Sequence, residues 1–402
     1  MGPLAGFRII EIAGLGPGPF CGMMLADMGA TVIRVDRPGD TMSSQLDPQL
    51  RNRQSICIDL KSNQGLEVLL RLVDGTDALF EGFRPGVAER LGFGPKVCLE
   101  QNPQLVYGRI TGWGQTGPLA STAGHDINYI ALSGTLHAIG RMGERPVPPL
   151  NLVGDFGAGG MLLAFGILCA LLETSRSGKG QVVDAAMLDG AIALMATFHA
   201  FRAIGLFDEK TGSNFLSGAA HFYDTYETKD GKFLAVGPLE PQFYRQFLKI
   251  AGLENEQMLA GGFSLEPGRM DKSNWPELKQ QIATALKQKT RDEWCVLFDG
   301  TDACVAPVLT TTEASQHPQN IARKNFIEVD GVLQHAPAPR FDRTPGVTPA
   351  KPSPAGADSR TLLSEAGYDP AQIEALKKFQ TSTRTLSEAS LKMTNAMFKG
   401  GK

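Results

Sequence analysis

The sequence predicts an α/β fold with a large parallel-sheet domain and a smaller α/β domain. A β-rich run, a glycine- and proline-rich loop, a helical segment and a second β-rich run follow one another within the first 40 residues. Short apolar runs then alternate with helical segments, which is typical of a doubly wound sheet. A length of 402 residues leaves room for two or three domains.

The first strand is expected at residues 7–12 and the second at 31–35, with a loop at 14–19 and a helix between them. Such a βαβ unit almost always has a right-handed crossover. Further strands are expected at 55–59, 78–80, 105–109 and 181–184. Because helical stretches separate them, these strands extend the parallel sheet.

Loss of hydrophobic periodicity marks the domain boundaries. The large domain is expected at 1–205, a linker at 206–225, a small α/β domain at 226–320, and a proline-rich connection with a polar tail at 321–402. The small domain carries a strand at 232–236 and helices at 242–251 and 275–287. The apolar run 161–172 is shorter than the roughly 20 residues of a membrane helix, so it is expected to form a buried helix.

Composition is that of an ordinary globular protein. A formal net charge of -3 and a pI near 6.1 argue against a general nucleic-acid binder. The six cysteines form no CxxC pair, which fits neither a metal site nor a disulfide framework. With no recognisable targeting signal, a cytoplasmic location is expected.

Three groups of residues are candidates for chemistry, and each has a simpler alternative. The first is the loop from Gly14 to Gly18 together with Asp36, whose spacing resembles a dinucleotide fingerprint. That pattern would suggest an NAD-dependent oxidoreductase, but Pro19 stands where the third glycine belongs. A tight turn between strand and helix explains the loop equally well.

The second group is basic: Arg37, Lys61, Arg84 and Arg90 lie near the ends of expected strands. Ligands of open α/β sheets bind outside the carboxyl ends of the strands, and arginine forks match phosphate oxygens. Exposed arginine and lysine side chains are, however, commonly just solvated.

The third group is His125 in the stretch Gly124-His-Asp-Ile-Asn-Tyr129, followed thirty residues later by Asp155. A lone histidine is more often packed or exposed than catalytic, and Asp155 before a glycine-rich helix start is also a plausible N-cap. The same placement would bring free amides and the positive end of a helix beside a carboxylate, which suits an oxyanion.

Seven segments together resemble the family III coenzyme A transferases, and within them the branch of racemases acting on 2-methylacyl-CoA. The likeness extends to about Pro345. The matching segments are 14–20, 25–38, 124–129, 149–156, 177–181, 235–243 and 302–308. The resemblance implies a Rossmann-like large domain to which the chain returns after the small domain, and an interlocked homodimer. The tail beyond about Leu386 has no counterpart.

The resemblance also implies roles for individual residues. Coenzyme A would lie on the large domain, with Arg37 at the ribose 3′-phosphate. His125 and Asp155 would be the catalytic pair, with Glu240 supporting Asp155. The remaining residues of the coenzyme A-binding surface would be Lys61, Arg84, Arg90, Gly124, Asp126 and Tyr129.

The expected activity is racemisation of 2-methylacyl-CoA thioesters through an enolate, by proton removal on one face of the α-carbon and return on the other. Backbone amides near Asp155 and Gly157 would stabilise the enolate oxygen. Coenzyme A is part of the substrate, so neither a metal nor a redox cofactor is expected. The alternatives are a CoA-transferase with Asp155 as nucleophile, disfavoured because relatives of that kind have an aromatic residue at position 125, and a non-catalytic coenzyme A-binding protein.

Overall fold

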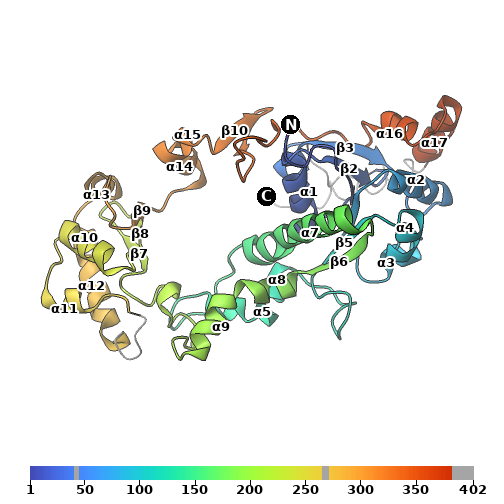
Figure 1. The fold of residues 1–402 in the computed structure, drawn as a ribbon. Coiled ribbons are helices and arrows are strands. Elements are labelled where there is room, and N and C mark those ends of the chain that lie inside the picture. The colour runs from blue at the N-terminus through green and yellow to red at the C-terminus, as the bar shows by residue number, and fades with distance from the viewer. Residues whose placement is uncertain (40–44, 265–270, 383–402) are drawn as a thin grey trace, which may run out of the picture. The chain divides into compact units, whose positions relative to one another are not determined.

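The computed structural model describes residues 1–39, 45–264 and 271–382, so the tail beyond Leu386 lies outside the described residues. The chain divides into two compact units (Figure 1). Unit 1 comprises Met1–Tyr129, Asn151–Ala191 and Lys324–Lys402, and unit 2 comprises Ile130–Leu150 and Ile192–Arg323.

Unit 1 is built on a six-stranded parallel sheet with the order β3-β2-β1-β4-β5-β6. The strands are β1 (Arg8–Ile12), β2 (Thr31–Asp36), β3 (Arg53–Cys57), β4 (Ala78–Glu81), β5 (Val106–Thr111) and β6 (Gln181–Ala186). This confirms the predicted α/β fold and its parallel sheet. The order reverses between β1 and β4, which is the point where doubly wound sheets leave a crevice for ligands.

Helices cover both faces of this sheet, and the core of unit 1 accordingly consists of two apolar clusters. Burial on both faces explains why consecutive apolar residues occur in the central strands, such as Ile9 and Ile10, which are both fully buried. The helices of the unit include α1 (Pro17–Asp27), α2 (Asn63–Asp74), α3 (Val87–Arg90), α4 (Pro95–Gln101), the π-helix η2 (Leu152–Met161), α7 (Leu162–Ser177), α16 (Ser359–Glu365) and α17 (Pro370–Ser382). Helices α5 (Asp126–Leu132) and α8 (Met187–Leu194) begin in unit 1 and end in unit 2.

Helix α7 is apolar on two faces. Leu163, Ile167 and Leu171 belong to the cluster beneath the sheet, whereas Phe165 and Leu172 are 64% and 56% exposed. The expectation of a fully buried helix is therefore wrong for the outer face. Among the described residues, the continuous helix η2 and α7 is the one whose length and composition would suffice to cross a membrane.

Unit 2 holds a three-stranded antiparallel sheet with the order β7-β8-β9. Its strands are β7 (Asp224–Glu227), β8 (Phe233–Val236) and β9 (Val305–Pro307). Its helices are α6 (Thr135–Ala138), α9 (Ala196–Ala203), α10 (Pro241–Ala251), α11 (Glu256–Ala260), α12 (Trp275–Leu286), α13 (Arg291–Phe298), α14 (Thr311–Gln316) and α15 (Pro318–Ala322).

The unit boundary differs from the expected linker at 206–225. Phe215 and Phe222, both within that range, are buried in the core of unit 2. These aromatic side chains lie in a 3-10 turn and loops, so they show no helical or strand period although they are buried. Unit 2 also includes 130–150 and 192–205, which were expected in the large domain.

A buried polar cluster fastens the last part of unit 1. The hairpin β10 (Phe326–Val329) and β11 (Val332–His335) follows the exit from unit 2. Arg51, fully buried, donates to both carboxylate oxygens of Asp27 at 2.5 and 3.0 Å. The same guanidinium donates to the Gln334 side chain at 2.7 Å and to the His335 carbonyl at 2.8 Å. This one side chain therefore joins the C-terminal end of α1 to the hairpin.

Replacing Arg51 by alanine should lower the free energy of unfolding by about 3 to 5 kcal/mol, because Asp27 would be left buried without its partner. Urea denaturation measures this change. Lys96→Ala is the control, since Lys96 and Glu100 form an exposed 3.9 Å pair whose loss should cost less than about 1 kcal/mol. Equal losses in the two variants would contradict the assignment.

Candidate active site

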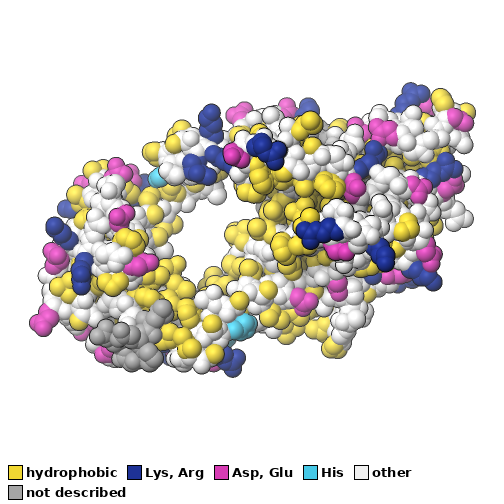
Figure 2. Space-filling view, in the orientation of Figure 1, with side chains coloured by type: hydrophobic (Ala, Val, Ile, Leu, Met, Phe, Trp, Pro, Cys, Tyr) yellow, Lys and Arg dark blue, Asp and Glu magenta, His cyan; other side chains and the backbone are white. Residues whose placement is uncertain are grey.

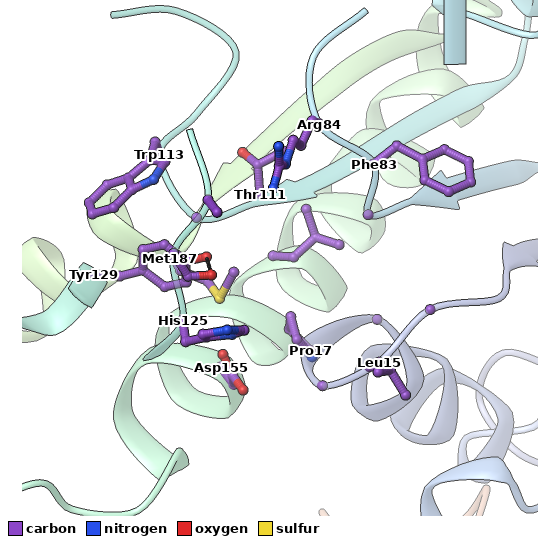
Figure 3. Close-up of a pocket in the computed structure, with 18 of the residues that line it drawn as sticks. Leu15, Pro17, Phe83, Arg84, Thr111, Trp113, His125, Tyr129, Asp155 and Met187 are labelled. Carbon is purple, nitrogen blue, oxygen red and sulfur yellow. Dashed lines mark hydrogen bonds between the residues drawn. The ribbon is translucent and has the colours of Figure 1, made fainter. Parts of the chain in front are cut away.

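A cavity of about 480 Å³ lies at the carboxyl ends of the central strands of unit 1. Its walls are formed by the loops that follow β1, β4 and β5, together with His125, Tyr129, Asp155 and Met187 (Figure 3). This is the switch point of the sheet, where ligand sites of open α/β sheets are found. The volume is within the range typical of small-molecule sites.

Asp155 lies in the π-helix η2, a geometry that sequence analysis did not predict. Glycines allow this helix to approach its neighbours: a Cβ at Gly160 would lie 2.7 Å from the Pro17 carbonyl oxygen, and one at Gly159 would lie 2.9 Å from Met187. π-Helical turns are often found at functional sites. The packing sets Asp155 against the start of α1.

Three neighbours constrain Asp155. Its backbone N–H donates to the Asp126 carboxylate at 2.8 Å, and its carboxylate accepts from the Asn151 side chain at 3.1 Å. Gly16 borders the same carboxylate, because a Cβ there would be 3.2 Å from Oδ2 of Asp155. Gly16 has φ +69°, a conformation that favours glycine.

Burial raises the pKa of the Asp155 carboxyl above its ordinary value. The hydrogen bond from Asn151 and the nearby His125 act in the opposite direction, whereas the charge of Asp126 adds to the rise in the pKa. The pKa of Asp155 is therefore raised overall, so the protonated carboxyl forms more readily than it would in water. A carboxyl of this kind can act as an acid as well as a base.

His125 directly precedes α5 and exposes its imidazole to the cavity. Its backbone N–H donates to the Asn128 side chain at 3.0 Å, and its carbonyl accepts the Asn128 N–H at 2.8 Å. These bonds fix the start of the helix and leave the ring free of them. Figure 3 shows the ring next to the Asp155 carboxyl, with both groups at one side of the cavity.

Of the four basic residues expected to bind coenzyme A, one lines this cavity and a second lies beside its wall. Arg84 lines the wall, and the Arg37 guanidinium lies 6.0 Å from the centre of the Phe83 ring, which also lines it. Arg90 is exposed at the end of α3, close to Gly86. Lys61 is exposed after β3 and does not line the cavity.

Of the residues expected to bind coenzyme A in the stretch 124–129, two line the cavity and one is buried. Gly124 and Tyr129 line the cavity. The Tyr129 ring packs edge-on against Trp113 at 4.8 Å, and its hydroxyl donates to the Gly124 carbonyl. Asp126, expected on the coenzyme A surface, is only 7% exposed and is directed to the Asp155 backbone instead.

Glu240 belongs to unit 2, where it is the exposed N-cap residue of α10. Asp36, expected as a ribose ligand in the dinucleotide interpretation, is buried. Its carboxylate accepts from the Ser55 hydroxyl at 2.6 Å and lies 3.2 Å from Arg34. The loop at 14–18 does line the cavity. An engaged Asp36 removes the main support for dinucleotide binding.

Several residues of the site were not expected from the sequence. Asn151 stands four residues before Asp155, and this spacing on a helix could have identified it. Trp113 and Met187 are also on the wall, but they belong to segments that carry no chemical signal in the sequence. Only the folding of β5 and α8 beside the cavity brings them there.

The chain is similar to known proteins both in sequence and in structure. The family model described as CoA-transferase family III matches residues 4–359. The protein named alpha-methylacyl-CoA racemase is 48% identical in Mus musculus, with 92% of this chain and 95% of that protein covered. The Homo sapiens protein of that name is 43% identical, with 96% and 100% covered. The crystal structure of Rv3272 from Mycobacterium tuberculosis superposes with a TM-score of 0.73 at 26% identity, covering 90% of this chain and 99% of that one.

Replacing Asp155 by asparagine should stabilise the protein at neutral pH. The Asp155 carboxyl has a higher pKa in the folded protein than in the unfolded chain, so the free energy of unfolding falls as the pH rises through the folded-state pKa. Below the ordinary pKa of 3.8, the carboxyl is protonated in both the folded and the unfolded state, and this loss of stability is absent. The unfolding midpoint of Asp155→Asn should therefore exceed that of the wild type at pH 7, and the gap should close in acid.

Urea midpoints across this pH range measure the effect, with the exposed Asp299→Asn as control. A gap that widens as the pH falls would show that the sign is wrong.

Proposed function

This chain belongs to CoA-transferase family III, and we propose that it is an isomerase that interconverts the R and S forms of 2-methylacyl-CoA thioesters. The two relatives named alpha-methylacyl-CoA racemase, alike over more than nine-tenths of the chain, support this activity. The observation that carries the proposal is the pairing of an imidazole and a carboxyl of raised pKa on the wall of one cavity.

The reaction needs an acid and a base on opposite faces of one carbon. With the S substrate, neutral His125 removes the α-proton and protonated Asp155 returns a proton to the other face; with the R substrate the roles reverse. The electron pair of the broken C–H bond moves into the thioester as an enolate, and reprotonation restores the carbonyl. No metal or redox cofactor takes part in this step.

The enolate oxygen requires hydrogen-bond donors. The Asp155 amide, expected as one of them, is already engaged by Asp126, so it is not available. The Gly157 amide was the other expected donor, and it lies two residues after Asp155 in η2. We therefore propose that the Gly157 amide stabilises the enolate oxygen.

The coenzyme A portion is proposed to extend from the cavity across the basic residues around it. Arg84 on the wall and Arg37 beside Phe83 are suited to phosphate groups, because a guanidinium donates two parallel hydrogen bonds. Arg37 is proposed for the ribose 3′-phosphate, and Lys61 and Arg90, both exposed, for the rest of the coenzyme A-binding surface, as the family resemblance implies. A supporting role for Glu240, which lies in unit 2, stays a prediction of the family resemblance.

A CoA-transferase is the alternative within the family. In that reaction Asp155 would attack the thioester as a carboxylate to form a mixed anhydride. The raised pKa works against this role, since a nucleophile must be ionised, and the adjacent imidazole is not needed for it. Racemisation uses both groups, each as the base for one enantiomer and as the acid for the other.

Incubation with a 2-methylacyl-CoA in heavy water, with a free carboxylic acid present, tests the proposal. Deuterium should enter the α-position while the acid stays free, because water exchanges with the catalytic groups between turnovers. Mass spectrometry measures both products. Transfer of coenzyme A to the acid without α-deuteration would instead establish the transferase.

The two groups should also separate by substrate. His125→Ala should slow exchange from the S substrate, and Asp155→Ala exchange from the R substrate, each by about 10²- to 10⁴-fold, since each removes the base for that enantiomer. The exposed His199→Ala in α9 serves as control. Near-normal exchange in Asp155→Ala would rule out its role.

We propose that the protein acts as a homodimer, interlocked as the family resemblance implies. The support is the outer face of α7, where Met161, Phe165, Leu168 and Leu172 are 38 to 64% exposed at helical spacing. Figure 2 shows hydrophobic side chains gathered over this helix. Exposed apolar patches of this kind mark protein–protein contacts, and a second copy provides a matching face.

Phe165→Glu should weaken the dimer, because a charge would be buried in its interface. Sedimentation should give twice the 43.1 kDa chain mass for the wild type and the single mass for the variant. Ser177→Glu adds the same charge at an exposed polar position of α7 that lies off this stripe, and it should remain dimeric. A wild type that sediments at the single mass would contradict the proposal.

A further inference from the structure

The two proposed catalytic residues, His125 and Asp155, lie on separate segments of the chain, 124–129 and 151–161. Between Tyr129 and Asn151 the chain runs through unit 2, so the connection from His125 to Asp155 leaves unit 1 and returns. Within the described residues, a single hydrogen bond joins segment 124–129 to segment 151–161, from the Asp155 N–H to the Asp126 carboxylate at 2.8 Å. The spacing of the catalytic pair therefore depends strongly on this contact.

The Asp155 amide needs such an acceptor. In a π-helix an N–H bonds to the carbonyl five residues earlier, which for Asp155 is that of Leu150, outside η2 and at φ +56°. Asn151, the N-cap residue, makes no capping bond with its side chain. Asp126 thus supplies from a distant segment the acceptor that a helix start ordinarily finds locally.

The charge of Asp126 is also directed at Asp155. Asp126 is 7% exposed, and among the described residues it forms no ion pair, while its Oδ1 atom has no hydrogen-bond partner. Arg84 lines the same cavity and, like Asp126, acts on the neighbouring Tyr129 hydroxyl. The groups that act on the Asp155 carboxyl are the Asn151 amide, the His125 imidazole and this carboxylate, with the Tyr129 hydroxyl also close. Of these, Asp126 is the one that opposes ionisation of Asp155.

We propose that Asp126 is a positioning residue for the reaction, whose carboxylate fixes the Asp155 backbone against the loop that carries His125. The charge on the same carboxylate opposes ionisation of Asp155. This inference rests on the proposed racemase function. It gives Asp126 a role other than contact with coenzyme A.

Two variants separate the hydrogen bond from the charge. Asp126→Asn keeps an acceptor oxygen but loses the charge, and Asp126→Ala loses both. The pH profile of kcat/KM for α-proton exchange is measured for each enantiomer. In Asp126→Asn the limb assigned to Asp155 should shift to lower pH for both substrates, because the carboxyl ionises more readily.

Asp126→Ala should show the same shift and, in addition, a loss of maximal rate of about tenfold to a hundredfold, because the Asp155 backbone is no longer held. Asp77→Asn is the matched control. Its carboxylate likewise accepts a backbone N–H, that of Arg8 at 2.7 Å, at the amino ends of the central strands, away from the cavity at their carboxyl ends. An unshifted profile in Asp126→Asn would overturn the inference.

A second readout does not depend on activity. Urea unfolding of Asp126→Asn, Asp155→Asn and the double variant at pH 7 forms a thermodynamic cycle. Repulsion between the two carboxyl groups predicts that Asp155→Asn stabilises the protein less when Asp126 is already asparagine. Additive effects would overturn the inference. A wild type without α-proton exchange, but with this coupling, would overturn only the proposed function.

Discussion

The parallel register of the central sheet is the constraint on which the site depends. Because β1 and β4 are neighbours although helices from the two halves cover opposite faces, the loops after these strands diverge and leave a crevice. Every wall of the cavity begins at a strand that this register aligns, and η2 closes it from the side. Loss of the β1 to β4 pairing would remove the crevice and the binding surface together.

Several charged side chains are buried in unit 1, and burying a charge is unfavourable unless it is paired. Glu11 and Arg53, or Glu81 and Arg109, are buried as pairs with good geometry, so each carboxylate has a cation. Asp126 has no such cation among the described residues. The buried carboxylates of Glu11 and Glu81 are paired with arginines, whereas the carboxylate of Asp126 stays unpaired beside the Asp155 carboxyl. Such an arrangement is typical of functional sites, where pKa values are shifted.

Local signals allowed much of the fold to be predicted. All six strands of the sheet were expected near their observed positions, because apolar runs bounded by glycine and proline are local properties of the sequence. The boundary between the two units was not predicted correctly, because Phe215 and Phe222 are buried by tertiary contacts although the sequence around them has no hydrophobic periodicity. The inward direction of Asp126 and the π-helical geometry at Asp155 are likewise set by packing against segments remote in the sequence.

The central claim is that one carbon of a bound thioester lies between the His125 imidazole and the Asp155 carboxyl. A crystal structure with an unreactive thioether analogue of 2-methylacyl-CoA tests it most directly. The account predicts that the α-carbon lies about 3 to 3.5 Å from a ring nitrogen of His125 and from a carboxyl oxygen of Asp155, on opposite faces. An α-carbon in contact with only one of the two groups, or with both on the same face, would contradict it.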